Sequence, residues 1–568
     1  MQDYPQLLMP IPADLLPLAG KLDVRSFALM AEFTQVRSHR LQIAVDGALD
    51  LWRPSRPRGR AAAQTPSAPP LLRIECSGLS SALPEFLNTE KDHGVLQSVA
   101  ESYRLRVDPT GITINATEEW GVLRGLATLT QLIAGAGSDS ELDGVQIDDV
   151  PRFAWRGLML DVARHFLSTE AILRTLDGMA LVKLNVLHLH LTDDQAFRFP
   201  SLAFPELGSG QAYSRSDLTR VVDHAAGLGI RVIPELDMPG HVTSWLTARP
   251  EWGSRPAMSS RKFGVHPACL DPTRESVYQA IDVLLGELAA LFPDSCVHLG
   301  GDEVQPGWWQ EDARIIEFCR AHQLDDARGD AAALQGYFFA RVAAMARQHG
   351  KRVVGWDEVL QHDLPADTIV QCWRGVTARD SARRRGCDAV VSAPYYLDLN
   401  YPADVHYQFD PDADEPALLA LEDGLLRDPR FEHIAKGMAW TRQWREQIAA
   451  TEATATEATA TEAKGSVEGG LQPGRVLGAE ACLWGELTDE ASLDVRLWSR
   501  LPALAERFWS PAEVPMAPFA RRLRHCQTVA LPSVGIDLED IQRSRLDAIG
   551  VPTAWWPLVD LLEPVKWY

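Results

Sequence analysis

Eight short runs of nearly continuous apolar residues follow Pro151, and they constrain the fold of this chain more than any other feature. Such runs are typical of strands that are buried on both faces, as in parallel sheets covered by helices. Longer amphipathic stretches, for example 169–181 and 273–291, separate the runs and have helical spacing. Eight strand and helix units in one region predict a (β/α)8 barrel, an α/β fold. The runs cover residues 157–163, 184–191, 230–236, 296–301, 352–356, 368–373, 388–393 and 475–484.

An open doubly wound sheet is the structural alternative to the barrel. No GxGxxG motif follows the first run, so the sequence lacks the mark of a dinucleotide-binding sheet. We therefore expect the barrel to occupy residues 151–510. An insert of TEATA-like repeats, about 449–470, interrupts it before the last strand, and we expect this insert on the face opposite the active site.

The regions on either side of the barrel differ from it in pattern. Residues 103–116 predict a hairpin whose turn contains Pro109 and Gly111, and a helical stretch over 118–133 follows it. Residues 1–150 are therefore expected to form a smaller α+β accessory domain. Its Pro-rich segment 53–70 is expected to be a disordered loop. The Trp-rich residues 511–568 are expected to pack on the outside of the barrel.

Composition limits the partners of the chain. Hydrophobic residues make up 46% and charged residues 23%, as in ordinary globular proteins. The formal net charge is −22, from 55 basic and 77 acidic residues, and such a surface repels phosphate backbones and anionic lipids. We therefore expect neither nucleic acid nor a membrane as a partner.

Cysteines and the N-terminus bear on the compartment. The eight cysteines are sparse and form no CxxC pair, so neither a disulfide framework nor a zinc or redox motif is indicated. The first 20 residues contain no basic residue, and prolines interrupt their apolar stretch, unlike a signal peptide. We expect a cytoplasmic location, or a periplasmic or secreted one if an export signal lies outside this chain.

Carboxylates and aromatic residues follow nearly every predicted strand. In a (β/α)8 barrel these positions meet at the face where active sites lie. Carboxylates that transfer protons and bind hydroxyls, interleaved with tryptophans that stack on sugar rings, are typical of a carbohydrate site. The residues concerned include Asp161, Arg164, Asp193, Glu235, Asp237, His241, Asp302, Glu303, Trp356, Asp357, Trp373, Tyr396, Asp398, Trp484 and Glu486.

The sequence HLGGDE at 298–303 is the strongest local signal. Two glycines allow close approach of the backbone, and two adjacent carboxylates follow where the strand ends. Adjacent residues on a regular strand face opposite ways, so Asp302 and Glu303 can serve one site only if the strand breaks there. The negative charge of Asp302 would favour the protonated form of Glu303, as a general acid requires.

These residues carry a resemblance to a known family. HLGGDE occurs in order with RGLMLDVARHF (156–166), LHLHLTDDQ (187–195), PELDMPGH (234–241), VGWDE (354–358) and LWGE (483–486). This set resembles the family 20 glycoside hydrolases, the β-N-acetylhexosaminidases, over residues from about 100 to 510.

The resemblance implies exo-acting, retaining hydrolysis of terminal N-acetylglucosamine or N-acetylgalactosamine, in which the 2-acetamido oxygen of the substrate is the nucleophile. Glu303 would be the general acid and base, and Asp302 would hold the acetamide. Substrate would be bound by Arg164, Trp356, Trp373, Tyr396, Asp398, Trp484 and Glu486, while Asp193 and His241 would support Glu303 from behind. The partner would be a small carbohydrate, and no cofactor or metal is implied.

Two other functions remain as alternatives. His188 and His190 lie two residues apart on one strand and so face the same way, as the ligands of a zinc-dependent amidohydrolase barrel do. A sugar-binding barrel without catalysis is the second alternative. The sequence leaves open the preferred sugar epimer, the natural substrate, the oligomeric state, the role of the TEATA insert and whether Trp308 and Trp309 contact the leaving group.

Overall fold

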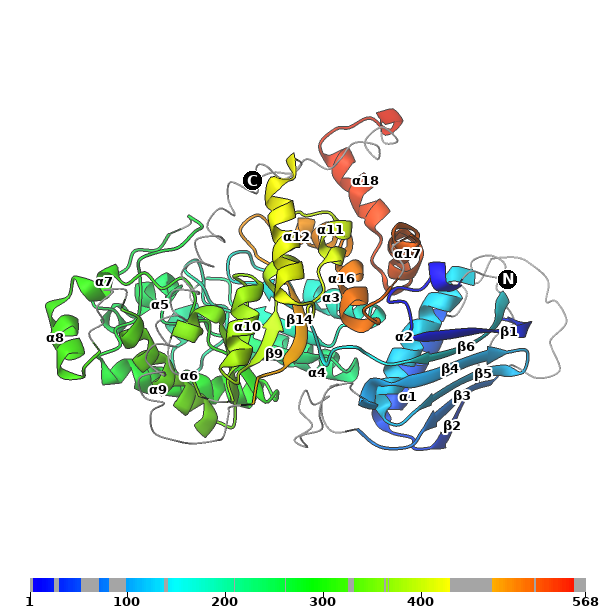
Figure 1. Ribbon diagram of the computed structural model, residues 1–568, viewed down its shortest axis with the longest axis horizontal. Coiled ribbons are helices and arrows are strands. Elements are labelled where there is room, and N and C mark those ends of the chain that lie inside the picture. Colours follow the sequence, from blue (N-terminus) through cyan, green and yellow to red (C-terminus); the bar gives the residue numbers. More distant parts are fainter. Residues whose placement is uncertain are drawn as a thin grey trace.

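The computed structural model describes residues 4–24, 30–52, 71–80, 99–136, 141–208, 210–260, 262–324, 331–361, 364–365, 367–429, 472–514 and 517–555. It contains a six-stranded sheet and a closed eight-stranded barrel. The sheet lies at one end of an elongated molecule and helices α7 and α8 lie at the other (Figure 1). The two segments expected as inserts, 53–70 and 449–470, fall outside the described residues.

The N-terminal sheet is mixed, with the order β1-β6-β4-β5-β3-β2. The predicted hairpin is present as the antiparallel pair β4 and β5, and the predicted helix after it is α2. Helices α1 and α2 pack side chains such as Leu41 and Leu129 into the apolar core of this sheet. The elements are β1 (Asp14–Asp23), β2 (Met30–Gln35), α1 (His39–Trp52), β3 (Leu71–Cys76), β4 (Tyr103–Asp108), β5 (Gly111–Ala116), α2 (Glu119–Ala136) and β6 (Glu141–Asp149).

All eight apolar runs after Pro151 are strands of one closed, parallel barrel, which confirms the predicted fold. The last strand closes the barrel by pairing with the first, with Gly478 opposite Trp155. The strands are β7 (Trp155–Asp161), β8 (Val186–His190), β9 (Arg231–Glu235), β10 (Cys296–His298), β11 (Arg352–Trp356), β12 (Ile369–Cys372), β13 (Asp388–Val391) and β14 (Val476–Leu483).

Helices surround the barrel, and several begin with side-chain caps. Ser168 caps α3, and Ser214 with Asp217 forms a capping box at the start of α4. The helices are α3 (Thr169–Leu181), α4 (Arg215–Gly227), α5 (Thr243–Ala248), α6 (Glu275–Leu291), α7 (Gly307–Gln310), α8 (Ala313–Ala321), α9 (Ala332–Gln348), α10 (Val376–Arg384), α11 (Ala403–Gln408), α12 (Glu415–Arg427), α15 (Glu490–Trp498) and α16 (Leu501–Trp509).

The interior of the barrel is layered. The lowest layer is apolar and takes one side chain from each strand: Trp155, Val186, Ile233, Cys296, Val354, Ile369, Val390 and Leu477. Residues two positions further along a strand point to the same side, one step up the barrel. That second layer is buried and mostly polar, and it includes His188, Glu235, His298, Trp356, Gln371 and Ser392. Glu480 follows Leu477 by three positions, because the register of β14 against β13 shifts before Gly478, and it joins this layer through contacts with His188 and Gln371.

Buried ion pairs join the sheet to the barrel. Asp149, at the end of β6, accepts hydrogen bonds from Lys183 (2.7 Å) after α3 and from Trp509 (3.0 Å) at the end of α16. Glu101, before β4, accepts hydrogen bonds from Arg124 of α2 (2.8 Å) and Arg156 of β7 (2.6 Å). All five charged side chains are 1% exposed or less.

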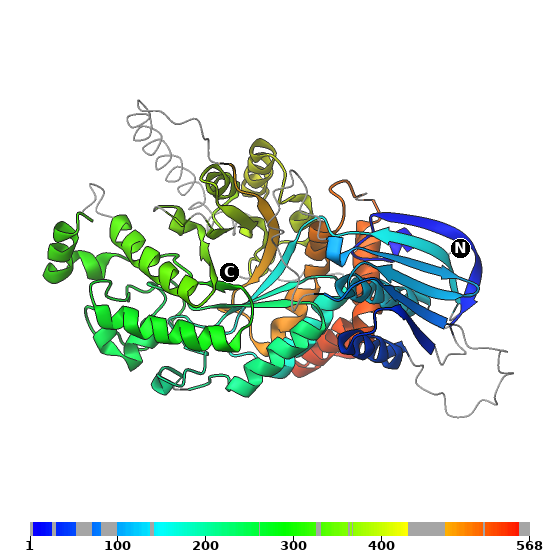
Figure 2. The same ribbon diagram turned by 90° about the horizontal axis from the view of Figure 1, so that it is seen from below.

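The C-terminal residues contact both parts of the molecule. Helix α17 (Phe519–His525) lies beside Tyr4–Gln6, the segment Cys526–Ala530 packs on α2, and Leu531–Val534 packs on α3. Helix α18 (Leu538–Ala548) packs on α15. The view turned by 90° shows this part running along the barrel close to the sheet (Figure 2). Within the described ranges, no helix combines the length and apolar character that a membrane span requires.

Candidate active site

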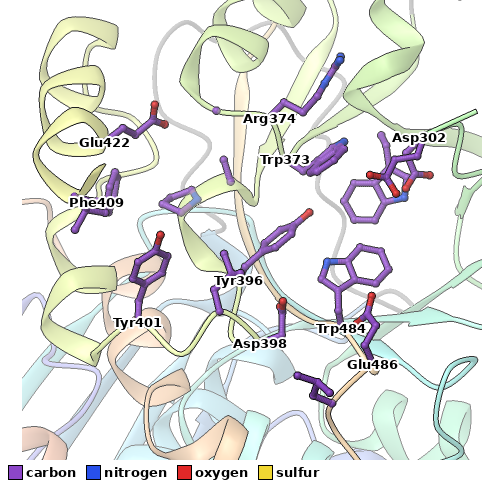
Figure 3. A pocket seen from close by; sticks show the side chains of 18 of the residues that line it. Asp302, Trp373, Arg374, Tyr396, Asp398, Tyr401, Phe409, Glu422, Trp484 and Glu486 are labelled. Carbon is purple, nitrogen blue, oxygen red and sulfur yellow. The ribbon is translucent and has the colours of Figure 1, made fainter. Parts of the chain in front are cut away.

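One cavity of about 510 Å³ opens at the C-terminal ends of the barrel strands, and side chains from most of the strand ends line it. It brings together all nine residues that the sequence assigned to catalysis and substrate binding. Asp302, Tyr396 and Trp484 are among those labelled around the cavity in Figure 3. Arg164 follows β7, the acid pair follows β10, and Trp356 ends β11. The remaining members of the set are Trp373 after β12, Tyr396 and Asp398 after β13, and Trp484 and Glu486 after β14.

The extended strand geometry of β10 ends just before Asp302 and Glu303. Strand β10 ends at His298, and positive φ angles follow at Gly300 (68°), Gly301 (98°) and Glu303 (49°). A Cβ atom at Gly300 would lie 1.6 Å from Asp237 Oδ1, so only glycine fits there. This departure from strand geometry lets the adjacent carboxylates of Asp302 and Glu303 face the same cavity.

Asp302 lies in an environment that disfavours its charge. Burial, and then the nearby carboxylate of Asp237, raises the pKa of Asp302 well above its usual range. Burial likewise raises the pKa of Asp237 to about 7. Asp302 Oδ1 is buried and has no hydrogen-bond partner among the described residues, so it can accept a hydrogen bond from a ligand.

Asp193 and His241 lie behind the acid pair and are buried. His241 Nδ1 is 3.4 Å from Asp193 Oδ1, and His241 Nε2 is 3.6 Å from Glu303 Oε2. Burial alone would lower the pKa of His241, but the Asp193 carboxylate raises it well above its usual range. The imidazole is therefore cationic, with one nitrogen on Asp193 and the other directed at Glu303.

Carboxylates hold Arg164 in place. Its guanidinium lies 3.0 Å from Asp161, 2.9 Å from Asp193 and 3.6 Å from Glu486, and it packs over the ring of Trp484. Burial opposes the charge, but these carboxylates raise the pKa of Arg164 well above its usual range. A fixed, permanently charged donor of this kind suits recognition of hydroxyl groups.

Buried carboxylates orient two tryptophans of the cavity wall. Trp356 Nε1 donates to Glu235 Oε1 (2.9 Å), and Trp373 Nε1 donates to Glu358 Oε2 (2.8 Å). Burial raises the pKa of Glu358 to about 8. The ring of Trp484 lies 5.6 Å from that of Trp356, and the tryptophans therefore form an apolar corner beside the acids.

Tyr396 completes this corner. Its ring is nearly parallel to that of Trp373, with centroids 6.4 Å apart, and its other ring neighbour is Trp484. Burial raises the pKa of Tyr396 well above its usual range, so its hydroxyl stays protonated and can donate a hydrogen bond.

Two further carboxylates, those of Asp398 and Glu486, line the cavity. Burial, and then the charge of Glu486, raises the pKa of Asp398 to about 7. Burial also raises the pKa of Glu486, although Arg164 opposes this shift. With Arg164 they form a polar rim that can bind several hydroxyls of one sugar.

The cavity also contains residues that the sequence did not predict. Beyond Trp373 and Tyr396 it continues to Tyr401, Phe409 and Glu422, on and around α11 and α12 (Figure 3). Phe263, from the long loop after α5, also lines the cavity, and its ring lies 5.6 Å from that of His165. These segments carry no strand-end motif, and their aromatic residues are the only signal that points to them.

Trp308 and Trp309 have different surroundings from those of the cavity tryptophans. Trp309 is a buried core residue whose Nε1 donates to the carbonyl of Leu270 (2.8 Å). Trp308 is partly buried against the same core and packs beneath Arg255. Among the described residues that line the cavity, neither is present.

His188 and His190 are paired with carboxylates. His188 lies 2.8 Å from Glu480 and 3.1 Å from Glu235, and His190 contacts Glu235 and Asp193. Both nitrogens of each ring thus face carboxylate oxygens rather than a shared open space. Four buried groups of His and carboxylates in this region have atoms within 4.8 Å of one another, and they belong to the same ion-pair network. This pairing disfavours the zinc amidohydrolase alternative.

Comparisons with known families account for most of the chain. Residues 153–512 match the profile described as glycosyl hydrolase family 20, catalytic domain, and residues 65–150 match domain 2 of the same family. The chain is 33% identical over 429 residues to the β-hexosaminidase subunit beta of Felis catus, covering 73% of this chain and 70% of that one. It is 31% identical over 426 residues to the subunit beta of Homo sapiens, covering 73% and 67%.

Solved structures give the same relationship. The chitobiase of Flavobacterium johnsoniae is similar with a TM-score of 0.78 and 29% identity, covering 100% of this chain and 79% of that chain. The β-N-acetylhexosaminidase of Streptomyces coelicolor is similar with a TM-score of 0.67 and 26% identity, covering 94% and 97%.

Proposed function

Because the chain belongs to glycosyl hydrolase family 20 and is a β-N-acetylhexosaminidase, we propose that Asp302 and Glu303 carry out its reaction together with the acetamido group of the substrate. The substrate is a small carbohydrate that ends in an N-acetylhexosamine. Substrate-assisted catalysis is general to this family and forms no covalent bond to the enzyme.

Glu303 first acts as the acid. It gives its proton to the glycosidic oxygen while the acetamido oxygen attacks the anomeric carbon, so the leaving sugar departs as an alcohol and an oxazolinium ion forms. Glu303 then takes a proton from water as that water attacks the same carbon. This second displacement opens the oxazolinium ring and restores the original configuration at the anomeric carbon. The partly exposed carboxyl of Glu303 at the cavity wall suits both steps.

Asp302 acts on the acetamide. Its free Oδ1 accepts the acetamide N–H, and its carboxylate balances the positive charge that develops on the oxazolinium ring. Burial opposes the ionised form of Asp302, so the substrate N–H and the developing charge are what favour it. This interaction grows stronger toward the transition state, as catalysis requires.

The other lining residues orient the terminal sugar. Trp356, Trp373 and Trp484 surround the acetyl group, and Tyr396 donates to its oxygen. Arg164 binds the 3- and 4-hydroxyls, and Asp398 and Glu486 bind the 4- and 6-hydroxyls. These contacts occupy the non-reducing end of the sugar, which supports exo cleavage. The charge of −22 supports a neutral glycan rather than nucleic acid or an anionic membrane as the partner.

One observation carries this proposal: two adjacent acids face one cavity that has an apolar tryptophan corner beside them. The test compares a nitrophenyl N-acetyl-β-glucosaminide with the same glycoside bearing a free 2-amino group. We expect only the first to be cleaved at a useful rate, because only it carries the nucleophile. We expect Asp302→Asn to lower kcat by about 10²-fold or more while the terminal sugar still binds. Equal rates on both glycosides would refute the mechanism, and wild-type turnover in the variant would refute the role of Asp302.

A further inference from the structure

Glu235, the last residue of β9, has four partners around one buried carboxylate. Oε1 accepts from Trp356 Nε1 (2.9 Å) and lies 2.9 Å from His298 Nδ1. Oε2 lies 3.1 Å from His188 Nε2 and makes a close contact with His190 Nδ1. Trp356 belongs to the cavity wall, so one of these contacts reaches the substrate site directly.

The contact with His190 begins a chain of alternating charges that ends at Glu303. His190 Nε2 is 2.9 Å from Asp193 Oδ2, and Asp193 Oδ1 is 3.4 Å from His241 Nδ1. His241 Nε2 is 3.6 Å from Glu303 Oε2. Because carboxylates face both nitrogens of His190, that ring is doubly protonated, and its charge requires Glu235 as a counter-ion.

We propose that Glu235 is a positioning residue for the reaction, since it orients the Trp356 wall and, through His190, Asp193 and His241, the proton-transferring carboxyl of Glu303. This inference rests on the proposed roles of Glu303 and Trp356. The chain of contacts places Glu235 outside the cavity, so it acts through these residues and not on the substrate.

The titratable groups around Glu235 come from several strands. They are His188 and His190 of β8, His298 of β10, Asp237 after β9, and Glu480 of β14 on the far side of His188. Burial alone would raise the pKa of Glu235, but the three histidines lower it well below its usual range. These contacts therefore favour the ionised form of Glu235.

Glu480 provides a matched control. It is as buried as Glu235, also contacts His188 (2.8 Å), and also accepts from an indole N–H, that of Trp155 (2.8 Å). Trp155, however, lies in the apolar layer below, and Glu480 makes its other hydrogen bonds to His188 and Gln371. Loss of charge at Glu480 thus disturbs the same layer, and it reaches the chain to Glu303 only indirectly, through His188 and Glu235.

The experiment compares two leaving groups. A dinitrophenyl N-acetyl-β-glucosaminide departs with little help from an acid, whereas a disaccharide of N-acetylglucosamine needs its glycosidic oxygen protonated. We expect Glu235→Gln to lower kcat about 10- to 100-fold on the disaccharide and less than about threefold on the dinitrophenyl glycoside. Gln keeps an acceptor for Trp356, so KM should change little. Glu480→Gln should lower both rates by the same factor.

Several results would overturn the inference. Equal losses on the two substrates in Glu235→Gln, or the same selective loss in Glu480→Gln, would show that Glu235 is only structural. If Glu235→Gln does not fold, His190→Gln interrupts the same chain and must show the same selectivity. Glu303→Gln serves as the reference: if it shows no selectivity, the proposed acid is wrong, and if it alone does, only the role of Glu235 fails.

Discussion

Two neighbouring layers of side chains inside the barrel come from the same strands but differ in polarity. The lower layer is apolar, with Ile233 and Val354 among its members, and the layer above carries Glu235 and Trp356 on the same two strands. Two residues along a strand span about 6.6 Å, so the change from a dry core to a charged network takes one step of the pleat. The lower layer therefore supplies stability, and the upper one shapes the active site.

Replacing the proposed acid, Glu303, should have the largest effect on activity and the smallest effect on stability. Glu303→Gln should lower kcat/KM on a disaccharide by about 10³-fold, because a positioned acid contributes 10²- to 10⁴-fold. The thermal midpoint should stay close to that of wild type, since the side chain is partly exposed. Steady-state kinetics and calorimetry on the same preparation test both statements. A large drop in the midpoint would contradict a purely catalytic role for Glu303.

The lower layer should give the opposite result. Ile233→Ala removes a buried side chain, and a loss of about 2–5 kcal/mol in the free energy of unfolding is expected. Turnover per folded molecule should remain within about threefold of wild type, because the nearest active-site contacts lie a layer above. Denaturant unfolding followed by kinetics at low temperature measures the two quantities. A selective loss of activity would contradict the division between the layers.

Glu358, which accepts a hydrogen bond from Trp373 of the cavity wall, should make the stability of the protein depend on pH. Its pKa is about 8 in the folded protein against an ordinary value of 4.5, so the folded state binds the extra proton between these values. Stability should therefore fall as pH rises from about 4.5 to about 8. Glu358→Gln keeps an acceptor for Trp373 Nε1 and should lack this fall, so its thermal midpoint should gain on wild type between pH 5 and pH 8. If the thermal midpoints of the two proteins changed with pH in parallel, the raised pKa of Glu358 would be contradicted.

The smallest effect is expected at Trp308. Its ring packs beneath Arg255 away from the cavity, so Trp308→Phe should change kcat/KM by no more than about twofold on a disaccharide. Trp373→Phe, which alters the cavity wall, is the matched comparison and should raise KM more. A tenfold change at Trp308 would place it in contact with the leaving group.

The sequence predicted the barrel because each strand is a continuous apolar run, and it predicted the acid pair because the two glycines of HLGGDE mark the break in β10. It suggested a metal site at His188 and His190, since their spacing puts them on one face. Their partners, Glu235 and Glu480, are 45 and 292 residues away from the histidines that they contact, and only the closed barrel brings them together. The extension of the cavity toward Tyr401 and Phe409 depends on how the segment after β13 folds back, which no local pattern specifies.

The buried pairs at Asp149 and Glu101 bear on how such a molecule can be recombined. Arg156 and Lys183 belong to the barrel half of the chain, yet their counter-ions come from the sheet half. A barrel joined to a sheet without Glu101 and Asp149 would leave two cations unpaired in a dry environment, at a cost of about 3–5 kcal/mol for each broken pair. A chimera that divides this chain between sheet and barrel must therefore supply both members of each pair.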